Sequence, residues 1–178
     1  PPAVSVRLGN VIRVRSREGL RRVNLQSSVS DFMPQTLQEF EKQYYLRLPP
    51  SGNFRTRQLA QLLAGESTSA RQFADKVLNY YRRQKFAYTL QPPLYNNNDG
   101  IDDFMFGSKQ GFCEHYAQSF VVMMRAAGIP AHVVTGHLGG DYQENGNFWQ
   151  IRSKDAHAWA EVWLADRQVW KRIDPTGA

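Results

Sequence analysis

Apolar residues recur at helical spacing in two long stretches of the chain. In the first stretch they form one face of a predicted helix over about residues 69–84, and hydroxyl groups at 67–69 suit its N-cap: Ala70, Phe73, Ala74, Val77, Leu78 and Tyr81. The second stretch begins at Cys113 and keeps the same spacing to Met124. Gly128 and Pro130 then end this helix, because glycine adopts the left-handed cap and proline cannot continue the helix.

The pattern before and between these helices is less regular. Two shorter helices are predicted over residues 31–48 and 56–63, each followed by proline or glycine. A short extended piece covers residues 86–90, and a loop rich in proline and asparagine follows it. The segment after the loop leads in to the cysteine, and we expect Asp102 and Asp103 to lie near solvent.

After the cysteine helix the pattern becomes extended. Strands are predicted over 131–137 and 148–152, with a glycine-rich turn at 139–147 between them. Residues 155–164 alternate, so that one set of side chains faces each side: Ala158, Ala160, Val162 and Leu164 against His157, Trp159, Glu161 and Trp163. A tight connection leads to the last strand, 169–174. The predicted fold class is α+β, with N-terminal helices followed by an antiparallel sheet packed on the helix that begins at Cys113.

Length and composition fit this architecture. The chain has 178 residues and 42% hydrophobic residues, enough for the core of one domain. A single cysteine excludes an intrachain disulfide and argues against a structural zinc site. No apolar run approaches the roughly 20 residues that span a bilayer, and no signal-peptide pattern is present. The start at Pro1 suggests a processed chain or an excised fragment.

The net charge of +6 is concentrated near the N-terminus. Residues 1–60 hold ten Lys and Arg against four Asp and Glu, whereas residues 61–178 hold twelve of each. We interpret residues 1–30 as an extended basic arm. Such an arm suits a solvated linker, or else a contact with an anionic membrane surface or polyanion. No nucleic-acid reading motif accompanies the charge, so nucleic-acid binding is not predicted.

Cys113 is the first candidate for chemistry. At a helix N-terminus, unpaired backbone N–H groups and the helix dipole favour a thiolate, which is the reactive form of cysteine. The alternative is a small buried hydrophobe, as many single cysteines are. The predicted hairpin favours the reactive cysteine, since its tight turn allows His157 and Asp174 to be cross-strand neighbours. A nucleophile, a base and a residue that orients the base then occur in the order Cys113, His157, Asp174.

The other histidines have simpler interpretations. His115 lies about 200° round the helix from Cys113, so the two do not readily share a metal, and we expect it to be partly exposed. His132 and His137 point to opposite faces of one predicted strand. We interpret both as ordinary histidines with satisfied hydrogen bonds.

No metal site is predicted from the acidic residues. Glu114 either shapes the site beside the cysteine or stabilises the helix electrostatically. Asp141 and Glu144 lie in a glycine-rich turn, which is more typical of a solvated loop than of a cation site.

Four segments together resemble the core of the transglutaminase-like superfamily, over roughly residues 67–178: Gly111-Phe112-Cys113-Glu114-His115-Tyr116-Ala117, Arg125-Ala126-Ala127-Gly128-Ile129-Pro130-Ala131, Asp155-Ala156-His157-Ala158-Trp159-Ala160-Glu161-Val162-Trp163 and Ile173-Asp174-Pro175-Thr176. The segment Tyr45-Leu46-Arg47-Leu48-Pro49 is similar to one in a bacterial branch of inner-membrane proteins with a periplasmic transglutaminase-like domain. The resemblance implies a papain-like catalytic domain over 31–178. It also implies a periplasmic location and an anchor of membrane helices absent from this chain.

The resemblance further implies a Cys113–His157–Asp174 triad that transfers the γ-glutamyl group of a protein glutamine to a primary amine. The alternative is a cysteine protease or amidase with the same triad, acting on substrates such as cell-wall peptides, and a third hypothesis is a catalytically silent binding module. No cofactor is expected, and calcium dependence is not supported because no dense acidic cluster is present. Eukaryotic family members stabilise the oxyanion with a tryptophan before the cysteine, but here all four tryptophans follow it. The oligomeric state is not predicted.

Overall fold

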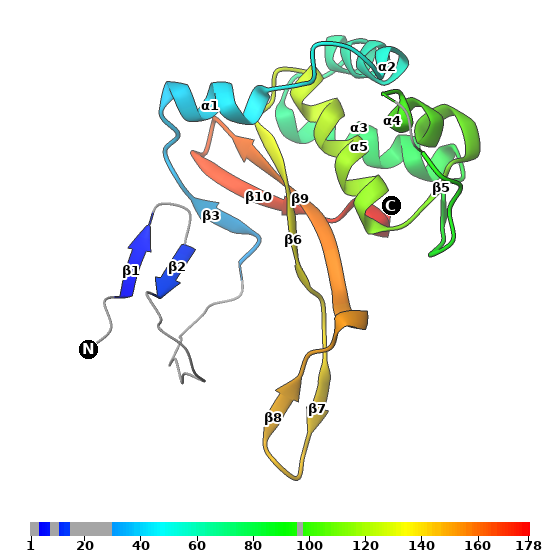
Figure 1. Ribbon diagram of the computed structural model, residues 1–178. Helices are drawn as coiled ribbons and strands as arrows, with labels where there is room; N and C mark the ends of the chain where they lie inside the picture. The colour runs from blue at the N-terminus through cyan, green and yellow to red at the C-terminus, as the bar shows by residue number, and fades with distance from the viewer. Residues whose placement is uncertain (1–3, 8–10, 15–29, 96–97) are drawn as a thin grey trace.

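The computed structural model describes residues 4–7, 11–14, 30–95 and 98–178, and in it a layer of helices packs on a sheet (Figure 1). The helices are α1 (Glu39–Leu46), α2 (Phe54–Gly65), α3 (Ala70–Arg83), the single turn α4 (Gly100–Asp102) with the π-helix η1 (Asp103–Ser108), α5 (Cys113–Ala126), and the short 3₁₀ helices η2 (Ser153–Asp155) and η3 (Pro175–Gly177). The predicted helices at 56–63, 69–84 and from Cys113 are confirmed. Ser69 Oγ caps α3 by accepting from the Gln72 N–H.

The main sheet has four antiparallel strands in the order β3-β10-β9-β6. Their bounds are β3 (Phe32–Pro34), β6 (Ala131–His137), β9 (Ala156–Leu164) and β10 (Val169–Ile173). β9 and β10 form the predicted hairpin, and β6 pairs with the other side of β9. The predicted α+β class and the antiparallel sheet on the cysteine helix are therefore confirmed.

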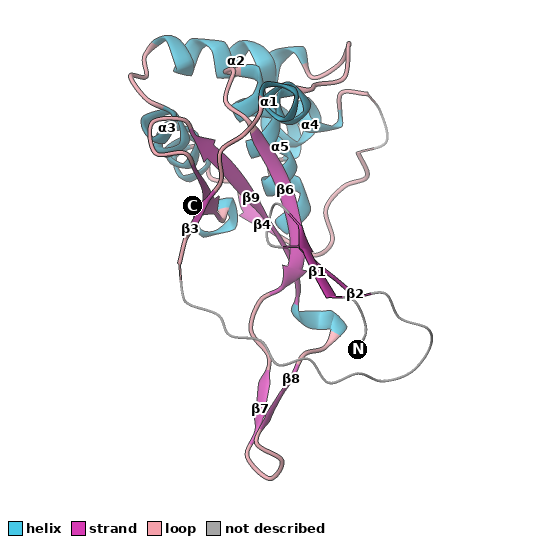
Figure 2. Cartoon of the chain, turned by 90° about the vertical axis from the view of Figure 1, so that its left-hand side faces the viewer, coloured by secondary structure: helices cyan, strands magenta, loops and turns pink. Residues whose placement is uncertain are grey.

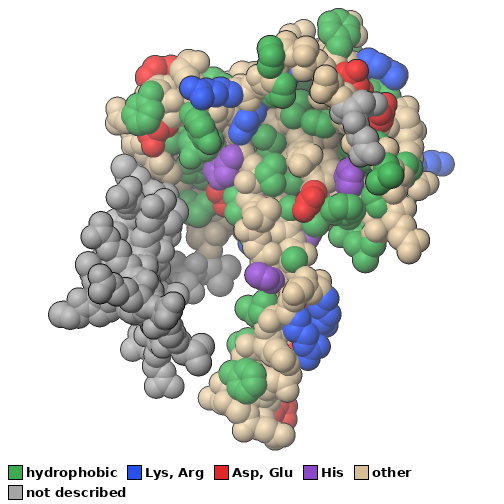
Figure 3. All heavy atoms as spheres, in the orientation of Figure 1, with side chains coloured by type: hydrophobic (Ala, Val, Ile, Leu, Met, Phe, Trp, Pro, Cys, Tyr) green, Lys and Arg blue, Asp and Glu red, His purple; other side chains and the backbone are tan. Residues whose placement is uncertain are grey.

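Smaller pairings extend this frame. β7 (Asp141–Gln143) and β8 (Phe148–Gln150) form a hairpin that projects from the ends of β6 and β9, away from the helices (Figure 2). Its first strand falls in the segment predicted as a turn. In the space-filling view the hairpin stands apart from the main body (Figure 3). β4 (Ala87–Tyr88) pairs in parallel with β5 (Gln110–Gly111), just before Cys113.

Within the arm predicted for residues 1–30, β1 (Val4–Arg7) and β2 (Val11–Val14) pair with each other in a two-stranded sheet. The remainder of that prediction lies outside the described residues. No helix in the described ranges is long and apolar enough to cross a membrane.

The sequence predictions for residues 31–38 and for Asp102 are wrong. The helix expected over 31–48 begins only at Glu39, because residues 32–34 pair with β10 and Pro34 lies in that strand. Asp102, expected near solvent, is buried and caps α2. Its carboxylate accepts from the Arg55 N–H at 2.9 Å, and from the Thr56 N–H and hydroxyl at 2.8 and 2.6 Å.

Hydrophobic residues cover both faces of the sheet. On one face α5 packs its buried side chains against the apolar residues of β9, β10 and β6, with α2 and α3 behind it. On the other face Leu37 packs with Trp163 and Trp170, and Met33 and Tyr45 close the cluster. The start of α5 therefore lies where the helical layer meets the sheet.

Candidate active site

Cys113 is the first residue of α5 and is 9% exposed. Phe112 before it is extended, and its N–H donates to His115 Nδ1 at 3.3 Å, which fixes the entry into the helix. Glycine is required at position 111, because a Cβ there would lie 2.8 Å from both Phe104 and His115. The thiol thus lies at a fixed helix N-terminus, beside N–H groups that stabilise negative charge.

His157 and Asp174 meet just beyond the paired part of the hairpin. The ladder between β9 and β10 ends at the pair Ala160 and Ile173, and the chain then brings the Asp174 carboxylate to 2.6 Å from His157 Nε2. Asp174 also accepts from the Thr176 N–H at 3.0 Å and from its hydroxyl at 2.6 Å. Burial raises the pKa of Asp174, but the hydrogen bonds from Thr176 and His157 outweigh it and lower that pKa overall. The carboxylate is therefore ionised and holds His157 by Nε2, which leaves Nδ1 for other partners.

Cys113 contacts the strand that carries His157 but is not hydrogen-bonded to the pair. It packs with Ala117 and with Ala158, the residue that follows His157 in β9. Both side chains are described, and no hydrogen bond joins the Cys113 sulfur to the His157 ring. The structure thus brings His157 and Asp174 into contact and packs the cysteine against Ala158, the next residue of β9 after His157.

Tyr88 is a residue of the site that the sequence did not single out. Its ring stacks on Tyr116 of α5, and its hydroxyl is close enough to Cys113 for the thiol to affect its pKa. Partial burial and the nearby thiol raise the pKa of Tyr88, and Asp174 adds to this. The phenol is therefore protonated at neutral pH and is a donor beside the thiol.

The parallel pairing of β4 and β5 positions Tyr88. Tyr88 lies opposite Gly111, the Thr89 N–H donates to the Gly111 carbonyl at 2.8 Å, and the Tyr88 ring stacks on Tyr116 with ring centres 6.3 Å apart. The sequence predicts an extended piece over 86–90, but two parallel strands of two residues each leave no recognisable pattern. The signal present in the sequence is an aromatic residue before the cysteine: Tyr88 is such a residue, whereas all four tryptophans follow Cys113.

Trp159 supports His157 from the same side of β9. The two rings are stacked, with centres 6.4 Å apart, and the Arg172 guanidinium lies 4.1 Å from the tryptophan ring centre. Glycine at 136 leaves room for this ring, since a Cβ there would lie 2.8 Å from it. Packing on Trp159 therefore restricts the orientation of the imidazole.

The remaining histidines do not take part in this site. His115 is partly exposed, as predicted, and burial lowers its pKa. His132 bonds Glu161 through Nε2 at 3.1 Å, but its Nδ1 is buried without a partner, so the prediction of a fully satisfied ring is wrong. His137 is exposed at the end of β6.

The acidic candidates are ordinary surface groups. Glu114 is exposed in the first turn of α5. Asp141 pairs with Arg152 at 2.7 Å and with Lys154 at 3.7 Å, and Glu144 is exposed. Within the described ranges, no three His, Cys, Asp or Glu side chains are grouped so as to hold a metal ion.

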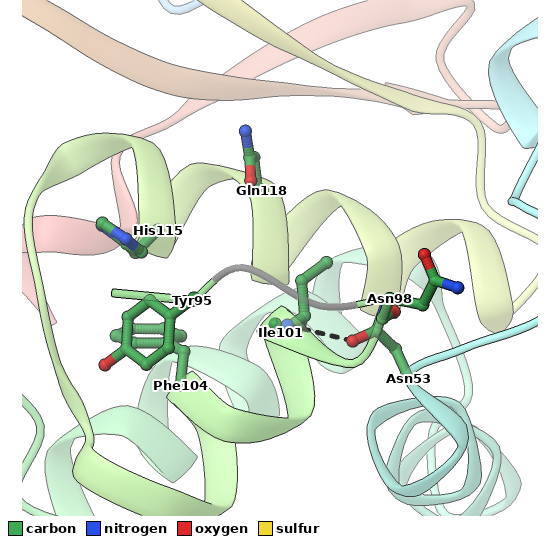
Figure 4. Close-up of a pocket in the computed structure, with 8 residues that line it drawn as sticks. Asn53, Tyr95, Asn98, Ile101, Phe104, His115 and Gln118 are labelled. Carbon is green, nitrogen blue, oxygen red and sulfur yellow. Dashed lines mark hydrogen bonds between the residues drawn. The ribbon is translucent and has the colours of Figure 1, made fainter. Parts of the chain in front are cut away.

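A cavity of about 190 Å³ lies beside α5, where His115 and Gln118 face Asn53 and Tyr95 (Figure 4). The Asn53 side chain has a structural role, since its Oδ1 accepts from the Ile101 N–H at 2.9 Å. None of Cys113, His157 and Asp174 lines this cavity.

Comparison with known proteins identifies the family of the chain. The sequence model of the transglutaminase-like superfamily matches residues 57–175. The chain is 43% identical over 131 residues to protein-glutamine gamma-glutamyltransferase of Pseudomonas aeruginosa, covering 74% of this chain and 19% of that protein. It is 33% identical over 138 residues to the uncharacterized protein YebA of Bacillus subtilis, again covering 74% and 19%. The chain therefore spans about a fifth of the length of these relatives.

Solved structures give the same match. The periplasmic domain of TgpA from Pseudomonas aeruginosa superposes with a TM-score of 0.75 at 40% identity, covering 79% of this chain and 48% of that one. A putative cysteine protease from Cytophaga hutchinsonii superposes with a TM-score of 0.56 at 18% identity, over 82% of this chain and 48% of that one, which indicates a shared fold.

Proposed function

The chain belongs to the transglutaminase-like superfamily, and on this basis we propose that it is an acyltransferase that joins the side chain of a protein glutamine to a primary amine. The observation that carries the proposal is the bonded pair His157 and Asp174 beside a cysteine at a helix N-terminus. The relative named as a protein-glutamine gamma-glutamyltransferase supports the choice of reaction.

In the first half of the reaction, the Cys113 thiolate bonds to the carboxamide carbon of the glutamine. The carbonyl oxygen becomes an oxyanion in the tetrahedral intermediate. When the intermediate collapses, the carbon–nitrogen bond breaks and the imidazolium of His157 gives its proton to the leaving ammonia. The product is a thioester on Cys113.

In the second half, a primary amine attacks the thioester carbon and passes a proton to the now neutral His157. The carbon–sulfur bond breaks, the thiolate is restored, and an amide remains on the substrate. Asp174 keeps Nε2 bonded throughout, so that Nδ1 is the nitrogen that exchanges protons. The direct exchange requires Nδ1 and the sulfur to come within hydrogen-bond distance, and catalytic hydrogen bonds often tighten only with substrate bound.

The oxyanion would be bound by the Cys113 N–H and the Tyr88 hydroxyl. The thiol of Cys113 is near enough to affect the pKa of the Tyr88 hydroxyl, so this hydroxyl lies close to where the oxyanion forms. With substrate bound, Tyr88 turns its O–H toward the oxyanion and becomes a donor. Its raised pKa keeps the proton in place for this role.

We also propose that the reaction needs no cofactor or calcium. The thiolate is the nucleophile and the imidazole is the acid and base, so the chemistry of these side chains has no step for a metal. Activity that is retained after dialysis against EDTA supports this, and activity that returns only with added calcium contradicts it.

The location follows from the same relationship. The matched solved domain is periplasmic, and we propose that this chain is likewise a periplasmic domain of a bacterial inner-membrane protein, whose substrates are proteins of that compartment. An export-dependent reporter fused after residue 178, active only outside the cytoplasm, tests this.

The direct test incubates the protein with a glutamine-containing protein and a labelled primary amine. We expect incorporated label and released ammonia in equal amounts, both abolished in Cys113→Ala. Ammonia or peptide release without incorporation, even at high amine concentration, would instead establish the amidase or protease. No reaction, together with slow alkylation of Cys113 at pH 6, would indicate the silent binding module.

A further inference from the structure

The strand β6 forms an open edge of the main sheet. It is the last strand in the order β3-β10-β9-β6, and among the described residues its only strand partner is β9. Two hydrogen bonds at the ends of this ladder fix which residues of β6 bond to β9: the Leu138 N–H donates to the Asp155 carbonyl, and the Trp163 N–H donates to the Pro130 carbonyl. Because bonded and non-bonded pairs alternate in an antiparallel ladder, the even-numbered residues of β6 direct their backbone groups toward β9.

The odd-numbered residues of β6 therefore present their backbone groups outward. The carbonyl of Ala131 accepts from Arg125 Nε at 2.8 Å, which confirms this direction and closes the upper end of the edge. In the described part of the structure, the outward N–H and C=O groups of Val133 and Thr135 have no hydrogen-bond partner. Such a row is a template for another extended strand.

A groove of about 560 Å³ follows this edge. Its walls are α5, through Gln118, Val121 and Val122, and α1, through Tyr44 and Tyr45, while β6 contributes its floor. Figure 1 shows β6 passing between these two helices. The walls are mostly apolar and aromatic, so they suit the side chains of a bound peptide while the edge holds its backbone.

The lower end of the groove adjoins the cluster around Cys113, although Cys113 itself does not line the groove. Val133 lines the groove and also packs on the cluster of Cys113, Ala117 and Ala158. Thr135 pairs directly with Ala158 across the ladder. Since a strand advances about 3.3 Å per residue, a segment paired along Val133 and Thr135 reaches the level of Cys113 within about two residues.

We propose that the acyl donor binds as an added strand on the open edge of β6, exchanging backbone hydrogen bonds with Val133 and Thr135 while its reactive glutamine points toward Cys113. The substrate class is thus a glutamine in an extended or unstructured protein segment, flanked by apolar residues that fit the groove. This inference rests on the proposed transferase function. A second copy of the chain is the other occupant that such an edge fits, and the experiments below separate the two.

The main test uses the native enzyme and a glutamine peptide of about ten residues, long enough to cover the edge at about 3.3 Å per residue. Each backbone amide near the glutamine is N-methylated in turn, and kcat/KM for incorporation of a fluorescent amine is measured. Methylation removes a donor, so we expect about a 2- to 10-fold loss at alternate positions, as for one lost hydrogen bond, and little change between them. Equal effects at all positions, or none, would overturn the added strand.

A pair of variants on α1 tests the groove wall. Tyr44 lines the groove, whereas Phe40, one turn earlier on the same helix, is 75% exposed and outside it. We expect Tyr44→Ser to lower the ratio of kcat/KM for the long peptide to that for a blocked single glutamine, and Phe40→Ser to leave the ratio unchanged. Equal ratios for the two variants would count against the groove.

Thr135→Pro tests the edge itself. Proline at this position removes an outward N–H that is not part of the ladder, and edge strands tolerate proline there. The ratio of kcat/KM for the long peptide to that for the blocked glutamine should fall about 2- to 10-fold. An unchanged rate of Cys113 alkylation would show that the fold is intact. A protein dimer in sedimentation that dissociates in Thr135→Pro, with no effect of peptide methylation, would assign the edge to a second copy and reject the proposal.

These outcomes are distinct from failure of the proposed function. If the native enzyme incorporates no amine into the unmethylated peptide or the blocked glutamine, the transferase reaction itself is rejected. If both are substrates but the alternation and the variant effects are missing, the reaction stands and the β6 edge does not bind the donor.

Discussion

At the scale of single residues, the state of the proposed site depends on Asp174. Three donors converge on this carboxylate, two from Thr176 and one from His157, and they lower its pKa although burial raises it. A carboxylate whose folded pKa is lowered stabilises the protein above its unfolded pKa of about 3.9, and that stabilisation is lost as the pH falls through the folded pKa.

Removing the Thr176 hydroxyl should therefore raise the pH below which the protein loses activity and stability. In Thr176→Val one of the three hydrogen bonds is lost, the pKa of Asp174 rises, and the acid limbs of both activity and stability move to higher pH. Thr176→Ser keeps the hydroxyl and should behave like the native protein. Activity and thermal unfolding measured between pH 3 and 8 check this. Identical pH profiles of Thr176→Val and Thr176→Ser in the acid range would contradict it.

Tyr88 provides a second test at this scale. Tyr88→Phe keeps the ring on Tyr116 and removes the hydroxyl beside Cys113. If the phenol stabilises the oxyanion, kcat should fall by about 100- to 1000-fold, as for other oxyanion donors, with little change in KM. Pre-steady-state release of ammonia measures this, and a native kcat would remove Tyr88 from the mechanism.

Residues were predictable from the sequence where neighbours along the chain define them. Cys113 follows from a helix start, and the contact of His157 with Asp174 follows from a hairpin with a short turn. Tyr88 was not predictable in this way, because its contact arises from a parallel pairing of strands 23 positions apart in register, Tyr88 with Gly111. The approach of Cys113 to Ala158 likewise depends on packing between layers.

At the scale of elements, α2 and the turn α4 stabilise each other's ends. Asp102 caps the start of α2 through Arg55 and Thr56, and Asn53 Oδ1 accepts from the N–H groups of Ile101 and Asp102. The sequence suggested a solvent-exposed Asp102 because its partners lie more than 45 positions earlier in the chain. A cap between distant segments has no local signature.

Loss of this cap should destabilise the domain. Asp102→Ala leaves buried N–H groups of α2 without an acceptor, so we expect the free energy of unfolding to fall by about 2–4 kcal/mol. The exposed Asp75 on α3 is the control, and Asp75→Ala should change the free energy of unfolding by less than about 0.5 kcal/mol. Urea denaturation measures both; equal midpoints would show that the buried cap is not important.

At the scale of the whole molecule, the domain extends beyond the motifs that identify it. The family resemblance begins near residue 67 and the matched family region at 57, yet β3 is an edge strand of the sheet and Leu37 covers its second face. The indole N–H groups of Trp163 and Trp170 both donate to Gln35. Sequence periodicity predicted the layers of helices and strands but not the contribution of β3 and Leu37. A strand of three residues is too short to show an alternating hydrophobic pattern.

Truncation tests this boundary. A chain that begins at Ser30 should unfold cooperatively with the native urea dependence. A chain that begins at Ser51 loses the residues that cover Trp163 and Trp170, so we expect red-shifted tryptophan fluorescence, binding of a hydrophobic dye and aggregation. Equal stability of the two chains would place the start of the domain after residue 50.

The acyl-enzyme on Cys113 is the species on which the proposed function depends, and intact-mass spectrometry of an acid-quenched reaction measures it directly. With a glutamine peptide and no amine, we predict a mass increase equal to the peptide less ammonia, located on the fragment that contains Cys113. Adding a primary amine should discharge it. Amine incorporation by Cys113→Ala at the native rate, with no adduct on the native cysteine, would contradict the account.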